Sequence, residues 1–178
     1  LTGRDLLLPT APDPGSDPGI AQMEPKFLVV GLGNPGREYE NTPHNLGFLV
    51  IDEMAKRNSV RVNRPECSAF VGLGMVSGKP VALAKPQTFM NLSGPSIKKL
   101  LEKYNLTPAE LILVYDEMDL PWTAVRIKQS GSAAGHNGVK SVIGSLGSGE
   151  FTRVRLGIDP GDRAKRGPSH VLGAFRPS

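Results

Sequence analysis

Apolar residues along the chain fall into short continuous runs and into helically spaced sets, with polar loops between them. Continuous runs are typical of buried strands, and apolar positions that recur every three or four residues are typical of amphipathic helices. The pattern predicts strands over residues 27–30, 70–76, 81–84, 111–115, 125–128 and 153–158, and helices over residues 44–57, 93–104 and 137–146.

Strands and helices alternate along most of this pattern, and one hairpin interrupts the alternation. Residues 77–80 read Ser-Gly-Lys-Pro between two apolar runs, which is typical of a tight turn that joins antiparallel strands. Strands joined through helices instead run parallel. We therefore expect an α/β fold, a single domain with a mixed, mostly parallel sheet flanked by helices on both faces.

The chain has 178 residues, about the length of one domain and a tail. Residues 1–25 are rich in proline and have no apolar periodicity, so we expect an extension that is disordered or foreign to the natural protein. Residues 26–178 are the expected folded domain. No apolar run reaches the roughly 18 residues that a membrane-spanning helix needs.

Basic side chains gather in the last third of the chain. Residues 1–119 carry 12 Lys and Arg against 14 Asp and Glu, whereas residues 120–178 carry 9 against 3. Such an excess favours a polyanionic partner. Arg126 with Lys128, and Arg153 with Arg155, stand at alternate strand positions, which puts each pair on one face of the sheet. A phosphate clamp and an ordinary solvated face both fit these pairs.

Several familiar catalytic patterns are incomplete in this sequence. Residues 31–36 match the G-x-G-x-x-G pattern of dinucleotide sites, but Pro35 removes a backbone donor that a pyrophosphate needs. No G-x-S-x-G nucleophile elbow occurs in the chain. The single cysteine, Cys67, excludes an internal disulfide and is interpreted as an inert thiol.

A metal site could be built from two histidines and two aspartates. The four candidates are His44, His136, Asp116 and Asp119, and their spacing matches no ligand motif such as H-E-x-x-H. We therefore expect no metal and no cofactor.

Three asparagines, one histidine and one aspartate form a more specific set. Asn34, Asn91 and Asn137 each lie between apolar elements, and carboxamides can grip an ester and stabilise an oxyanion without charge. His44 lies near a helix start, and Asp116 follows a buried strand and could orient an imidazole that takes a proton from water. The set predicts attack by water without a covalent intermediate, although each asparagine alone also fits a turn.

Five motifs, in order along the chain, resemble those of bacterial-type peptidyl-tRNA hydrolases. They are VGLGNPG at residues 30–36, Tyr39 followed by His44-Asn45, TFMNLSG at residues 88–94, DEMDLP at residues 116–121 and GHNG at residues 135–138. The resemblance runs from about residue 27 to residue 175. It implies a single α/β domain that hydrolyses, without a cofactor, the ester that joins a peptide to tRNA.

The resemblance also implies roles for individual residues. His44 would be the general base that activates water, Asp116 its orienting partner, and Asn34 a residue that helps to place His44 and the substrate. The implied substrate-binding residues are Tyr39, Met90, Asn91 and Asn137, and the implied ligands of the tRNA terminal phosphate are Lys128 and Arg155.

The implied partner is tRNA, in the form of the peptidyl-tRNA substrate. We expect a cytoplasmic monomer with no membrane contact and no obligate protein partner. Relatives in plant organelles serve RNA splicing, which leaves open a catalytically silent RNA-binding role. We also expect the chain, which stops at Ser178, to lack the C-terminal helix that family members carry.

Overall fold

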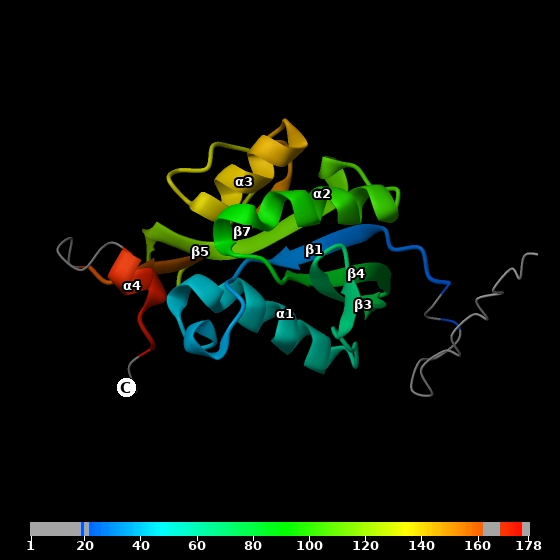
Figure 1. Ribbon diagram of the computed structural model, residues 1–178, viewed down its shortest axis with the longest axis horizontal. Helices are drawn as coiled ribbons and strands as arrows, with labels where there is room; N and C mark the ends of the chain where they lie inside the picture. The colour runs from blue at the N-terminus through cyan, green and yellow to red at the C-terminus, as the bar shows by residue number, and fades with distance from the viewer. Residues whose placement is uncertain (1–18, 20–21, 162–167, 176–178) are drawn as a thin grey trace, which may run out of the picture.

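Four parallel strands form the centre of the fold. They are β1 (Phe27–Gly31), β4 (Lys79–Pro86), β5 (Leu111–Pro121) and β7 (Thr152–Asp159), and they lie side by side in the order β4-β1-β5-β7. The computed structural model describes residues 19, 22–161 and 168–175 (Figure 1). Most of the expected N-terminal extension therefore lies outside the described residues.

Antiparallel strands complete both edges of the sheet. β2 (Arg64–Glu66) and β3 (Ala69–Val76) extend it beyond β4, and β6 (Val125–Lys128) extends it beyond β7. β3 and β4 are joined at Ser77 and Gly78, which both have left-handed φ values. The expected mixed sheet with a parallel centre is confirmed.

Helices cover both faces of the sheet, as expected. α1 (Leu46–Arg57) lies on one face, and α2 (Ser93–Lys103) and α3 (Asn137–Leu146) lie on the other (Figure 1). The alternate residues Leu28 and Val30 of β1 pack on the side of α2 and α3, whereas Val29 packs with residues of α1. Burial on both faces explains the continuous apolar run.

Short helices shape the loops at the ends of the strands. The five-residue helix α4 (Pro168–Leu172) was not predicted, because five residues are too few for a helical period to appear in the sequence. None of the helices in the described ranges is long and apolar enough to cross a membrane. The 3-10 turns are η1 (Arg37–Tyr39), η2 (Pro43–Asn45), η3 (Met90–Leu92) and η4 (Pro108–Glu110).

Two glycines let α1 approach the sheet at backbone contact. A Cβ atom on Gly31 would lie 2.1 Å from the carbonyl oxygen of Gly47, and a Cβ atom on Gly47 would lie 2.5 Å from that of Val114. Both distances are far shorter than any van der Waals contact, and the opposing atoms belong to the backbone. The start of α1 is therefore fixed against β1 and β5.

Replacement of Gly47 by alanine is expected to destabilise the fold by about 1–3 kcal/mol, because the methyl group has no space. Gly144→Ala is the matched control, since a Cβ atom at this exposed position of α3 meets nothing within 4 Å. The control should leave stability unchanged or raise it by up to about 1 kcal/mol. Urea unfolding of both variants measures the difference, and equal effects would contradict the close approach.

Candidate active site

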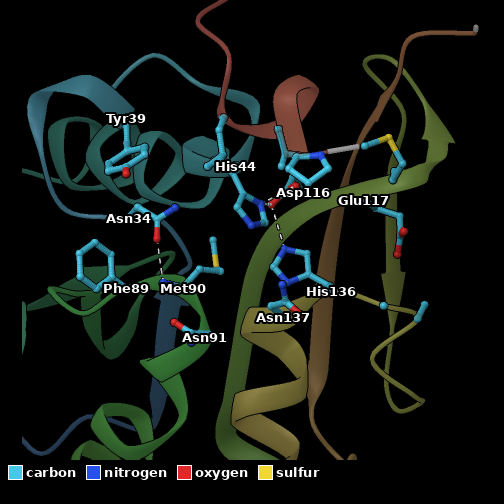
Figure 2. A pocket seen from close by; sticks show the side chains of 16 residues that line it. Asn34, Tyr39, His44, Phe89, Met90, Asn91, Asp116, Glu117, His136 and Asn137 are labelled. Carbon is cyan, nitrogen blue, oxygen red and sulfur yellow. Dashed lines mark hydrogen bonds and ion pairs between the residues drawn. The ribbon is translucent and has the colours of Figure 1, made fainter. Parts of the chain in front are cut away.

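A cavity of about 540 Å³ opens beyond the end of β1 and beside the middle of β5 (Figure 2). Five separate parts of the chain meet there, near the end of a parallel strand, which is where sites gather in such sheets. The structure brings together in its wall all the expected catalytic and substrate-binding residues, Asn34, Tyr39, His44, Met90, Asn91, Asp116 and Asn137. The two expected phosphate ligands do not line it.

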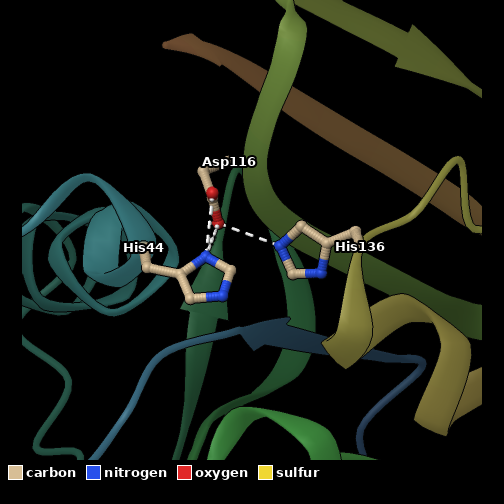
Figure 3. Close-up of side chains that lie close together, drawn as sticks. All are labelled: His44, Asp116 and His136. Atoms are coloured by element: carbon tan, nitrogen blue, oxygen red, sulfur yellow. Dashed lines mark hydrogen bonds and ion pairs between the residues drawn. The ribbon is translucent and has the colours of Figure 1, made fainter. Parts of the chain in front are cut away.

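Asp116 lies between two histidines (Figure 3). Nδ1 of His44 is 2.8 Å from both carboxylate oxygens, and Nε2 of His136 is 2.9 Å from Oδ1. Asp116 is buried within β5, one residue before Glu117, and the strand continues past the expected end at residue 115. His44 belongs to the 3-10 turn η2, not to α1, which begins two residues later.

Hydrogen bonds determine which nitrogen of each neutral imidazole carries the proton. A carboxylate accepts only, so Nδ1 of His44 and Nε2 of His136 both donate to Asp116. Nδ1 of His136 accepts from the backbone N–H groups of Gly138 and Val139 at 3.1 and 3.3 Å, at the start of α3. The remaining nitrogen of His44, Nε2, is therefore the one with a free lone pair.

The two histidines also set the ionisation of Asp116. Burial raises the pKa of this carboxyl, but the hydrogen bonds from His136 and His44 outweigh burial and hold the pKa well below its usual range. Asp116 thus stays charged and keeps both imidazoles oriented.

The same three side chains are the group that could hold a metal. Ligand atoms of His44, Asp116 and His136 lie within 4.8 Å of one another, and the group does not include Asp119. A metal on Nε2 of His136 would move the ring proton to Nδ1, where two N–H groups of α3 already point. The tautomer that α3 favours therefore suits a hydrogen-bonded triad better than a metal centre.

Asn34 is held in place by two other loops. The Asn45 side chain accepts from the backbone N–H of Asn34 at 2.8 Å and donates to its carbonyl oxygen at 2.9 Å. Oδ1 of Asn34 accepts from the backbone N–H of Met90 at 2.8 Å. This chain of bonds ties the loop after β1 to the His44 turn and to η3, and it leaves Nδ2 of Asn34 as the amide donor.

Two further side-chain amides have no internal hydrogen bonds within the described residues. The side chains of Asn91 and Asn137 are exposed at the cavity, and neither makes a hydrogen bond to any part of the chain that the structure describes. Such groups can donate to or accept from a substrate without first breaking an internal bond. Apolar side chains of Phe89 and of the unpredicted helix α4, Val171 and Leu172, form another part of the wall.

The expected basic pairs lie beside the cavity. In the register of β6 and β7, Arg126 is opposite Arg155 and Lys128 is opposite Arg153, so the four side chains share one sheet face. Lys128 is exposed, and Arg155 is partly exposed. These two expected phosphate ligands therefore remain accessible.

Arg153 is buried, so it does not bind phosphate together with Arg155. Its side chain is 1% exposed and lies 4.5 Å over the ring of Phe151. The guanidinium donates to the carbonyl oxygens of Gly131, Ser132 and Gly149. Strand alternation correctly predicted its face, but loops from elsewhere in the chain cover it, so it cannot bind a phosphate.

Sequence reasoning considered His136 only as a metal ligand and missed its bond to Asp116. The available signal was its place directly before α3, where it caps the helix with its own ring nitrogen. Helix caps are usually Ser, Thr, Asp or Asn. A histidine there indicates that the second ring nitrogen has another partner.

The hydrogen-bond pattern predicts the tautomers of the neutral histidines. His44 is expected as the Nδ1–H form and His136 as the Nε2–H form, because these nitrogens face the Asp116 carboxylate. His170 is also expected as the Nε2–H form, because its Nε2 faces the carbonyl oxygen of Ile158 at 2.8 Å. Long-range ¹H–¹⁵N correlation spectra at mildly alkaline pH distinguish the two forms. An Nε2–H form of His44 would contradict the free lone pair.

The lowered pKa of Asp116 predicts how stability depends on pH. An unfolded aspartate has a pKa of about 3.9, so the stabilisation by ionised Asp116 is present above that value and is lost as pH falls toward the folded pKa. Asp116→Asn has no proton to take up. Its free energy of unfolding should fall less steeply below about pH 4, by on the order of 1 kcal/mol. Urea unfolding at stepped pH measures this, and parallel curves would contradict it.

Comparisons with known proteins point to one family. The family model described as peptidyl-tRNA hydrolase matches residues 28–178. A peptidyl-tRNA hydrolase of Solibacter usitatus is 53% identical over 152 residues, which are 85% of this chain and 78% of the relative. One of Bacillus cytotoxicus is 49% identical over 148 residues, which are 83% of this chain and 80% of the relative.

Solved structures agree with the sequence comparisons. The crystal structure of peptidyl-tRNA hydrolase from Acinetobacter baumannii is 35% identical, has a TM-score of 0.78 and covers 86% of this chain and 79% of its own. A peptidyl-tRNA hydrolase in complex with N-propanol has the same identity and TM-score and covers 84% of this chain and 76% of its own. Sequence and fold agree over most of the chain, which therefore belongs to the peptidyl-tRNA hydrolase family.

Proposed function

We propose that this protein hydrolyses the ester between peptide and tRNA by direct attack of water, with His44 as the general base. The observation that carries the proposal is the His44–Asp116 contact, because it directs the proton of the neutral imidazole to Nδ1 and leaves the lone pair on Nε2 of this cavity residue. The products are free tRNA and free peptide.

The reaction proceeds in two steps. Nε2 of His44 takes a proton from water while the water oxygen bonds to the ester carbonyl carbon, which gives a tetrahedral oxyanion. The C–O bond to the ribose then breaks, and the imidazolium returns the proton to the departing ribose oxygen. Asp116 stabilises the imidazolium through Nδ1–H and takes no proton itself.

Carboxamides stabilise the charge that develops on the carbonyl oxygen. Asn34 has Nδ2 to offer, and Asn91 and Asn137 make no internal side-chain bonds within the described residues. Asn34 is held before the reaction by its bond to Met90 and can stabilise an oxyanion without reorganisation, whereas Asn91 and Asn137 would turn toward the substrate as it binds. We assign the peptidyl part of the substrate to these amides, with Tyr39 and Met90 beside them.

The composition of the cavity wall supports water as the nucleophile. Among the described residues of the wall, none is a serine, threonine or cysteine. Cys67 lies away from it, in the turn between β2 and β3. The wall thus offers none of the usual alcohol or thiol nucleophiles of acyl-enzymes, which favours direct transfer of the ester to water.

The tRNA phosphate is assigned to Lys128 and Arg155. Both belong to the basic sheet face that Glu117 shares, and the last third of the chain carries the positive excess. Phosphate contacts orient a nucleic acid and do not depend on its base sequence. The proposed enzyme acts as a monomer in the cytoplasm, where peptidyl-tRNA is released from translation.

His44→Ala is expected to lower turnover of N-blocked peptidyl-tRNA by about a hundred- to ten-thousandfold, because the general base is lost. Binding of deacylated tRNA should remain, since His44 touches no proposed phosphate ligand. Release of free peptide measures turnover, with circular dichroism as the control for folding. Folded wild-type protein that binds tRNA without releasing peptide would favour the silent RNA-binding role instead.

Lys128→Ala is the matched variant, and it is expected to weaken tRNA binding and leave the chemical step intact. It should raise KM and make the dependence of tRNA binding on salt concentration shallower by about one unit of slope, with kcat unchanged. An unchanged slope would remove Lys128 from the phosphate site.

A further inference from the structure

Glu117 places a carboxylate on the basic sheet face. It stands two residues after Tyr115 in β5, and Tyr115 is opposite Arg155 in the register with β7, so Glu117 and Arg155 are diagonal neighbours. Oε2 of Glu117 lies 3.6 Å from Nη1 of Arg155. Glu117 also lines the cavity beside Asp116 (Figure 2).

The Glu117 carboxylate is buried, yet its contacts are longer than is usual for a buried charge. The Glu117 side chain is 9% exposed, and buried carboxylates are normally paired at hydrogen-bond distance. Among the described residues it also accepts from the backbone N–H of Asp119, at 3.3 Å to Oε1. Neither contact reaches the 2.7–2.9 Å that is usual for a charge-assisted hydrogen bond.

Arg155 is also incompletely bound. Its Nε atom is buried and has no hydrogen-bond acceptor among the described residues, and its Nη1 atom has only the long contact to Glu117. A guanidinium carries five N–H donors in a planar fork that fits two oxygens of a phosphate. Both members of the ion pair could thus form stronger bonds with another group.

We propose that Glu117 competes with the tRNA phosphate for Arg155 and thereby limits the affinity of the protein for tRNA. The proposal rests on the assignment of Arg155 to the phosphate. A phosphate that approaches Arg155 has to replace Glu117 and then lies close to a second negative charge. tRNA consequently binds less tightly than the basic face alone would allow, and the product leaves sooner.

The chemistry of the exchange is favourable on both sides. Arg155 replaces one long contact with two short ones to phosphate oxygens. Glu117 keeps the N–H of Asp119 and faces the cavity, where water can solvate the freed oxygen. Displacing Glu117 therefore uses up part of the binding free energy of the phosphate, and the Glu117 carboxylate remains solvated at the cavity.

Glu117→Gln tests the proposal, because it removes the charge and keeps the shape and the acceptor for the Asp119 N–H. The dissociation constant of purified deacylated tRNA is measured by fluorescence anisotropy at about 0.1 M salt, with circular dichroism as the control for folding. The variant is expected to bind about three- to tenfold more tightly, mainly through slower dissociation. Glu102→Gln, an exposed position on α2 with the same charge change, should alter affinity less than twofold.

A double-mutant cycle with Arg155→Gln identifies the path of the effect. If Glu117 acts through Arg155, Glu117→Gln should bring little or no gain in affinity in the Arg155→Gln background. An equal gain in both backgrounds, or equal gains for Glu117→Gln and Glu102→Gln, would overturn the competition. Absence of tRNA binding by folded wild-type protein would instead overturn the proposed function, and the competition with it.

Discussion

One buried carboxylate holds the site of this protein together. Asp116 is 2% exposed, and a carboxylate so buried stays ionised only when donors surround it. His44 and His136 supply these donors from positions 72 and 20 residues away in the chain. Since both must reach one carboxylate, the turn before α1, the middle of β5 and the start of α3 have a fixed relation to one another.

Local patterns predicted the parts of the fold that burial determines. The run at residues 27–30 marks a strand with helices on both sides, and the Ser77-Gly78 turn marks the antiparallel hairpin. Asn34 and Asp116 could be placed at one site because each follows an apolar run, and sites gather beyond the carboxyl ends of strands in such sheets. The same logic predicted that these residues come together in one cavity.

Features that depend on contacts between distant segments could not be predicted. Arg153 and Arg155 have the same place in the strand alternation, and only the loops at residues 131–132 and 149 make one of them buried. The bond of His136 to Asp116 depends on the ring tautomer that α3 favours. The expected helix start at His44 differs by one 3-10 turn, because such a turn has almost the same spacing over three residues.

The buried guanidinium of Arg153 fixes the backbone at one edge of the cavity wall. It holds the carbonyl groups of Gly131 and Ser132, just before the wall residues Ala134 and Gly135. Pulling those carbonyls away would strand a cation in the interior, so any movement has to turn about bonds beyond Ser132. One buried side chain therefore fixes the backbone on this side of the wall, although it does not itself line the cavity.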